Sequence, residues 1–312
     1  MLVTATKTAP LPSVGLSEPK PRPIRKISLR APTALQLPAV LWLLTLCFVP
    51  AGALLASSFL TYEGPRVLFD PTMQNYAGLF EDGTFVRILW ATVWVSLVTA
   101  LTCAILAYPV AHYLVRSRSR WRLVVMTLVI SPLVASVVVR TYGWLVLLEN
   151  DGAVSQILQF LGLIDHPVGF RGTYVAIIVG LVHVLLPFSV FTTMSSLQSV
   201  DPSLEKAARD LGAGAFTTFM KITLPLSKSG VLAGVILVFA ICLGAFATPH
   251  ILGGGRVQTL STLVRDRMVT TLDWGQASAV AIVILVLGLV VVSSLMWIAR
   301  SRASRPKEGS TR

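Results

Sequence analysis

Six long apolar stretches, separated by short segments that hold most of the charges, constrain this chain more than any other feature of its sequence. Each is long enough to cross about 30 Å of hydrocarbon at about 1.5 Å per residue. Their residues do not alternate between apolar and polar, as membrane-spanning strands would require. The sequence therefore predicts an all-α polytopic membrane protein with six transmembrane helices. The stretches are Leu37–Leu60, Ile88–Val115, Leu123–Leu148, Thr173–Leu197, Val231–Leu252 and Ala277–Ile298.

The composition agrees with a membrane-spanning bundle. Hydrophobic residues make up 54% of the 312 residues and charged residues 13%, whereas soluble domains carry about 25% charged residues. We expect a disordered tail over residues 1–34, which are rich in Pro, Ser, Thr and basic residues. We expect the transmembrane domain to cover residues 35–300, followed by a short tail over 301–312. The length leaves no room for a separate soluble domain.

Lys and Arg are unevenly distributed among the segments that flank the apolar stretches. The N-terminal tail, the segments after the second and fourth stretches and the C-terminal tail hold nineteen of them, and the alternate segments hold six. Because basic residues concentrate on the cytoplasmic side of membrane proteins, both termini and the segment 198–229 are predicted to be cytoplasmic. The same distribution explains most of the net charge of +12, so no nucleic-acid partner is needed to account for it.

The sequence offers little for catalysis or metal binding. Cys47, Cys103 and Cys242 lie inside apolar stretches and form no C-x-x-C pair. The glycines at 253–255 lack the G-x-x-x-x-G-K-[ST] pattern of a phosphate-binding loop, so we do not expect this chain to hydrolyse ATP. We predict no catalytic residue, no metal site and no cofactor. A membrane-embedded enzyme would need a convergent cluster of His, Asp, Glu or Ser, and none stands out.

Two polar residues inside the apolar stretches are candidates for lining a transport path. An ionisable residue within a membrane is a functional candidate, which singles out Arg140. Arg140 also lies far enough along its stretch to reach the outer interface, where it would be a structural anchor. His183, one turn before Pro187, is either a path residue or a hydrogen-bonded packing residue. A self-contained secondary transporter would need carboxylates deep in the spans, and the sequence places none there.

The segment "DPSLEKAARDLG" (Asp201–Gly212) predicts a short amphipathic helix between the fourth and fifth stretches. Asp201 followed by Pro202 is typical of a helix start, and Gly212 stands where a glycine ends a helix. Apolar residues recur at helical spacing, and charged residues cover the remaining surface. The apolar stripe consists of Leu204, Ala207, Ala208 and Leu211, and the charged residues are Glu205, Lys206, Arg209 and Asp210.

Two interpretations of this helix remain open on physical grounds. Its small apolar residues suit close docking into a groove of a cytoplasmic partner. Alternatively, the helix lies on the membrane surface or packs against its own bundle.

The same segment resembles the signature of the membrane subunits of binding-protein-dependent ABC importers. That signature reads E-A-A, three residues, G, nine residues, then I-x-L-P. Lys206-Ala207-Ala208, Gly212 and Ile222-Thr223-Leu224-Pro225 match its spacing at every step. The chain departs from it at Lys206, which occupies the position of the family's glutamate, and Glu205 stands one residue earlier.

The resemblance extends over about Leu37–Ile298. The segments 138–158, 244–266 and 273–280 are similar to the spermidine/putrescine branch of these permeases. The resemblance implies a type I ABC importer permease fold, a bacterial inner membrane location and polyamine import. In the family the signature loop forms a coupling helix that sits in a cleft of the ATPase subunit. The ATPase-coupling residues implied here are Leu204, Glu205, Lys206, Ala207, Ala208, Asp210, Leu211, Gly212, Ile222, Leu224 and Pro225.

The resemblance also implies a set of partners around this chain in the lipid bilayer. They are two copies of a cytoplasmic ATPase subunit, a second permease subunit, identical or different, and a periplasmic solute-binding protein. Because the binding protein selects the solute, another small solute, such as an opine or an amino-acid-like compound, remains an alternative to a polyamine.

Overall fold

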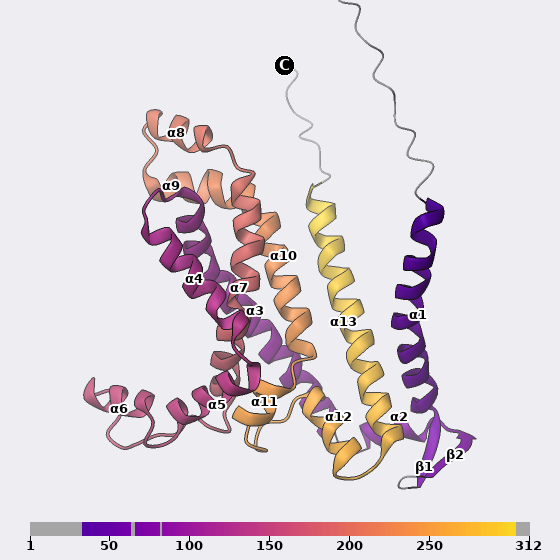
Figure 1. Ribbon diagram of the computed structural model, residues 1–312. Coiled ribbons are helices and arrows are strands. Elements are labelled where there is room, and N and C mark those ends of the chain that lie inside the picture. Colours follow the sequence, from indigo (N-terminus) through magenta and orange to yellow (C-terminus); the bar gives the residue numbers. More distant parts are fainter. Residues whose placement is uncertain (1–32, 64–65, 82, 304–312) are drawn as a thin grey trace, which may run out of the picture. The chain divides into compact units, whose positions relative to one another are not determined.

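The computed structural model describes residues 33–63, 66–81 and 83–303, and most of them are helical (Figure 1). The chain divides into two compact units at Val49, within α1 (Thr33–Ser58). The expected tails 1–34 and 301–312 lie almost entirely outside the described residues. Because α1 begins at Thr33 and α13 continues to Ala303, helical structure extends slightly beyond both expected tail boundaries.

Five continuous segments of the described chain are long and apolar enough to cross a membrane, and a bent helix pair makes a sixth. The continuous segments correspond to five of the six predicted spans, one of them with shifted bounds. They belong to α1, α3 (Thr84–Arg116), α7 (Tyr174–Gln198), α10 (Leu224–Leu243) with the turns before it, and α13 (Trp274–Ala303).

The third predicted span is present as a bent pair of helices and not as one continuous helix. It divides into α4 (Trp121–Val134) and α5 (Val137–Leu148), and the chain bends by 104° between α4 and the segment Val137–Phe160 that begins with α5. Fourteen residues give α4 a length of only about 21 Å. Pro132 cannot donate an N–H to the carbonyl of Leu128, and the hydroxyl of Ser131 donates to it instead, at 3.0 Å. The helix ends two residues later.

The fifth predicted span is also shifted, towards the N-terminus. α9 (Ala215–Thr218), the π-helical turn η1 (Phe219–Thr223) and α10 follow one another directly, and α10 ends before Gly244. The π turn ends two residues before Pro225, whose ring would otherwise crowd a carbonyl of the preceding turn. Residues 247–252, which were predicted to continue the span, form a separate short helix, α11 (Ala247–Leu252).

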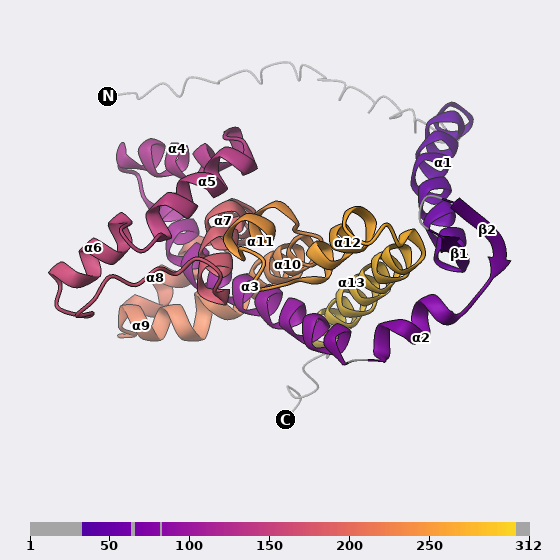
Figure 2. The ribbon, with the colours of Figure 1, turned by 90° about the horizontal axis from the view of Figure 1, so that it is seen from below.

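Three helices pack together at the centre of residues 50–312. α3, α7 and α10 contact one another pairwise and bury residues such as Cys103, Leu181 and Phe239 (Figure 2). Gly230 of α10 allows the closest approach, because a side chain there would overlap Ser196 and the carbonyl of Thr192 on α7. Small residues that let backbones meet are typical of helix packing in membranes.

Shorter elements join the ends of the long helices. An antiparallel hairpin of β1 (Leu60–Glu63) and β2 (Arg66–Pro71) leads into α2 (Gln74–Phe80), and none of these was predicted. α6 (Ala153–Phe160) follows α5, and α12 (Leu260–Val269) precedes α13. In Figure 1, α5, α6, α11 and α12 lie at one end of this unit, and α8 and α9 lie at the other, together with the last turns of α13.

Candidate functional site

The segment singled out in the sequence forms α8 (Pro202–Asp210), as predicted. Asp201 is its N-cap, because its Oδ1 accepts a hydrogen bond from the backbone N–H of Ser203 at 2.8 Å. The same N–H lowers the pKa of the Asp201 carboxyl, since it stabilises the charged form. Pro202 occupies the first turn, where its missing N–H costs no hydrogen bond.

A left-handed glycine ends α8, also as predicted. Gly212 has φ = +84°, a conformation that side chains with a Cβ rarely adopt. The N–H of Gly212 donates to the carbonyl of Arg209 at 2.9 Å, and the N–H of Ala213 donates to the carbonyl of Ala208 at 2.9 Å. These two bonds form a Schellman motif, which turns the chain sharply towards α9.

The predicted apolar stripe divides into an exposed part and a buried part. Leu204 and Leu211 are 46% and 89% exposed, and Ala207 is exposed between them. Ala208 is 8% exposed and packs against its own chain, so it lies outside the exposed part of the stripe. A periodic pattern locates the apolar positions of a helix but does not say which of them its own chain covers.

Glu205 lies inward and not on the charged outer surface where it was expected. The residue is 6% exposed, and its Oε1 accepts hydrogen bonds from Arg116 Nη2 at 2.9 Å and Thr223 Oγ1 at 3.2 Å. Arg116 Nη2 also donates to the carbonyl of Val200 at 3.0 Å. Arg209, four residues later, approaches the other carboxylate oxygen at 3.9 Å. Glu205 therefore joins α8 to the end of α3 and to η1.

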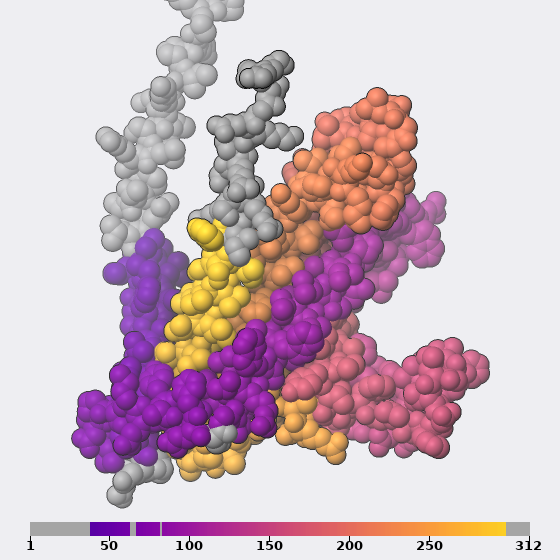
Figure 3. All heavy atoms as spheres, turned by 180° about the vertical axis from the view of Figure 1, so that it is seen from behind, coloured from indigo at the N-terminus to yellow at the C-terminus, as the bar shows by residue number. Residues whose placement is uncertain are grey.

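The remaining coupling candidates surround this junction. Lys206 and Asp210 are exposed on α8. Ile222 lies half-buried in η1, and Leu224 and Pro225 begin α10. Figure 3 shows this orange part of the chain projecting at one end of the unit.

Sequence reasoning missed four residues of this region. Phe216 and Met220 are 72% and 45% exposed and extend the apolar surface of α8 onto α9 and η1. Their apolar character in an inward segment was a signal that could have been used. Arg116 could not be told apart from the other basic residues after the second span, and Thr223 carried no signal of its own.

Arg140 lies in the first turn of α5, just after the bend, and His183 of α7 contacts α5 through Trp144. The Nη2 of Arg140 donates to the carbonyl of Ala135, the last residue before the break, so Arg140 supports the bend. Trp144 donates from its Nε1 to His183 Nδ1 at 2.9 Å, which leaves the ring hydrogen of the neutral imidazole on Nε2. These contacts favour the anchoring and packing interpretations over that of a transport path.

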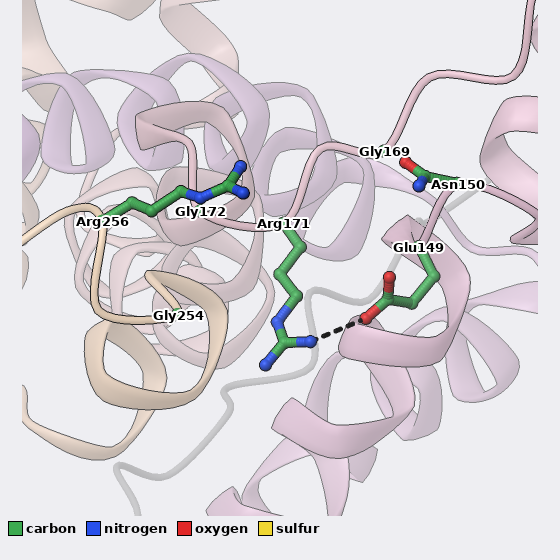
Figure 4. Close-up of a pocket in the computed structure, with 7 residues that line it drawn as sticks. All are labelled: Glu149, Asn150, Gly169, Arg171, Gly172, Gly254 and Arg256. Carbon is green, nitrogen blue, oxygen red and sulfur yellow. Dashed lines mark hydrogen bonds and ion pairs between the residues drawn. The ribbon is translucent and has the colours of Figure 1, made fainter.

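A pocket of about 250 Å³ lies at the end opposite α8, among three loops (Figure 4). Arg171 and Arg256 project from two of these loops, and Glu149 binds Arg171 at 3.2 Å. The loop that contains Arg171 is fixed by two backbone hydrogen bonds of 2.8 Å. The N–H of Phe170 donates to the carbonyl of Leu148 at the end of α5, and the N–H of Gly172 donates to the carbonyl of Leu252 at the end of α11. The pocket is lined by Glu149, Asn150, Gly169, Arg171, Gly172, Gly254 and Arg256.

The fold and its short surface helix define a class of protein: a multi-pass membrane permease. The family described as binding-protein-dependent transport system inner membrane component matches residues 100–304, and the chain belongs to that family. The match includes α8 and its glycine.

Individual relatives cover almost the whole chain. It is 31% identical over 265 residues to the spermidine/putrescine transport system permease protein PotB of Haemophilus influenzae, covering 85% of this chain and 91% of that protein. It is 32% identical over 267 residues to PotB of Escherichia coli, covering 85% and 94%. A chain of a bacterial alginate ABC transporter, crystallised with a periplasmic protein bound to an alginate pentasaccharide, has the same fold. Its TM-score is 0.73 at 20% identity, covering 87% of this chain and 94% of that one.

Proposed function

We propose that this protein is one of two permease subunits of an ATP-driven importer for polyamines such as spermidine and putrescine. The observation that carries the proposal is the identity of 31% to 33% along 85% of the chain with spermidine/putrescine permeases from several bacteria. The alginate transporter shares only the fold and says nothing of the solute.

The exposed apolar surface of α8 is the proposed contact with the ATPase. Leu204, Ala207 and Leu211 present it on α8, and Phe216 and Met220 continue it. An exposed apolar surface on a short capped helix suits insertion into a groove of a soluble partner. Two ATPase subunits would be bound, one by each permease subunit, and closure of the ATPase pair would rock the two halves of the transport path.

The opposite end of the unit is the proposed contact with a solute-binding protein. Its pocket presents Arg171 and Arg256 on loops that backbone hydrogen bonds hold in place. Carboxylates on the partner would complement these cations. With α8 in the cytoplasm, this end faces the periplasm of a bacterium with an inner membrane, and both termini are cytoplasmic.

Transport by the reconstituted system tests the proposal. The chain is co-expressed with candidate ATPase, permease and solute-binding subunits, and the assembled complex is placed in liposomes that contain ATP. We expect uptake of radiolabelled spermidine, competed by unlabelled putrescine and not by opines or amino acids. An assembled, ATP-hydrolysing complex that takes up another solute and no polyamine would contradict the proposed substrate.

A further inference from the structure

We propose that Glu205, Arg116 and Thr223 form a clamp through which a force on α8 reaches the transmembrane helices. The inference rests on the proposed function of α8 and assigns a mechanical role to side chains that need not touch the ATPase. Arg116 and Glu205 are thus positioning residues for transport.

The contacts of α8 with its own chain are few, and one of them is ionic. Within α8 the buried residues are Glu205 and Ala208. The side chain of Ala208 is a methyl group, which makes only weak and non-directional contacts. The carboxylate of Glu205 is held by two hydrogen bonds from two other elements, one of them from a cation. A charge-assisted bond fixes distance and direction more strictly than an apolar contact.

The residues that meet at the clamp come from distant parts of the sequence. Arg116 is the last residue of α3, and Thr223 is the last residue of η1, directly before α10. Arg116 also holds the carbonyl of Val200, in the turn between α7 and α8. A displacement of α8 therefore pulls on three long helices, α3, α7 and α10.

Further hydrogen bonds continue from the clamp into the bundle. Ser227 Oγ donates to the carbonyl of Thr223 at 2.7 Å and shares a hydrogen bond of 2.8 Å with the hydroxyl of Tyr108 on α3. Ser196 of α7 donates to the carbonyl of Ser227 at 3.2 Å. Tyr108 lies eight residues before Arg116, so this second connection is about 12 Å further along α3. The clamp and this second set of hydrogen bonds therefore each connect α3, α7 and α10.

The largely buried ion pair between Arg116 and Glu205 supports a directional role for the clamp. Removing two charges from water is costly, and apolar residues of similar size often hold a junction equally well. The exposed Arg209 guanidinium, at 62% exposed, makes the weaker 3.9 Å contact with the same carboxylate. The strong contact of Glu205 is therefore the inward one, towards the helices that must move.

The test uses the whole complex and a double variant, Arg116→Met with Glu205→Leu. Removing both charges together avoids an unpaired buried ion, so the variant is expected to fold and to retain its ATPase in co-purification. Uptake and the stimulation of ATP hydrolysis by solute-loaded binding protein should each fall at least fivefold. Arg116→Lys keeps the cation, so its uptake and its stimulation of ATP hydrolysis should both lie between those of the double variant and the wild type.

Arg118→Met is the matched control, because it removes an exposed cation two residues from the clamp that forms no ion pair with the described residues. It should behave as the wild type. A folded double variant that retains its ATPase and shows wild-type stimulation overturns the clamp. A double variant that loses its ATPase also overturns it, since the pair would then serve docking. If the wild-type complex itself lacks an ATPase, the proposed function fails first, and the clamp fails with it.

Discussion

At the scale of single residues, Leu211 is the strongest test of the proposed ATPase contact. It is 89% exposed at the end of α8, so a charge is tolerated there in the free chain. In a docked complex, Leu211→Glu would bury an unpaired carboxylate, which costs about 3 kcal/mol, or roughly a hundredfold in affinity. We expect the ATPase to be lost in co-purification while the permease remains folded.

Leu163 provides the control for Leu211, because it is also exposed but belongs to the segment that follows α6, and that segment lies at the other end of the unit. Leu163→Glu should keep the ATPase. Ala208→Glu would not serve as a test of docking, because Ala208 is buried within the chain and a carboxylate there would disturb the permease itself. If Leu211→Glu retains the ATPase at the wild-type ratio, α8 is not the docking helix.

Gly212 gives a second test at this scale. Gly212→Val places a β-branched residue at φ = +84° and should strain the turn by about 1–3 kcal/mol. Gly214→Ala is the matched control, since Gly214 has φ = −64° and open space at its Cβ position. We expect Gly212→Val alone to reduce stimulated ATP hydrolysis in the reconstituted complex. Equal hydrolysis by both variants would show that the turn's geometry does not matter for coupling.

At the scale of elements, the bend between α4 and α5 is supported by the side chain of Arg140, which reaches back to the end of α4. Arg140→Ala removes the donor to the carbonyl of Ala135 at the end of α4. The variant should have a lower thermal midpoint in detergent and should keep its ATPase in normal ratio, because α8 lies at the other end of the unit. Loss of the ATPase from a folded Arg140→Ala variant would contradict this assignment.

The elements also show what could be predicted from the sequence and what could not. Apolar length alone predicted the five continuous spans, and capping residues predicted both ends of α8. The division of the third span at Ala135 was not predicted, because a proline can either kink or end a helix and hydropathy continues across the break. The inward position of Glu205 depends on Arg116, which is 89 residues away in the sequence. No local pattern contains that pairing.

At the scale of the whole molecule, the proposed function requires one orientation in the membrane. The segment between α3 and α4, which contains the exposed cations Arg118 and Arg120, lies at the end that carries α8. The segment between α6 and α7, which contains Asp165, lies at the other end. The excess of basic residues on one set of segments predicts that the α8 end is cytoplasmic. If that is correct, Arg118 and Asp165 lie on opposite sides of the inner membrane.

Single cysteines at these two positions, in a Cys47→Ser background, test the orientation directly. The remaining Cys103 and Cys242 are buried, so they should not react. A membrane-impermeant maleimide added to cells with a permeabilised outer membrane should label Asp165→Cys and leave Arg118→Cys unlabelled. Lysis of the cells should then expose Arg118→Cys to the reagent. The reverse pattern in intact cells would place α8 on the outer side, where no ATPase could reach it, and the coupling role of this helix would be excluded.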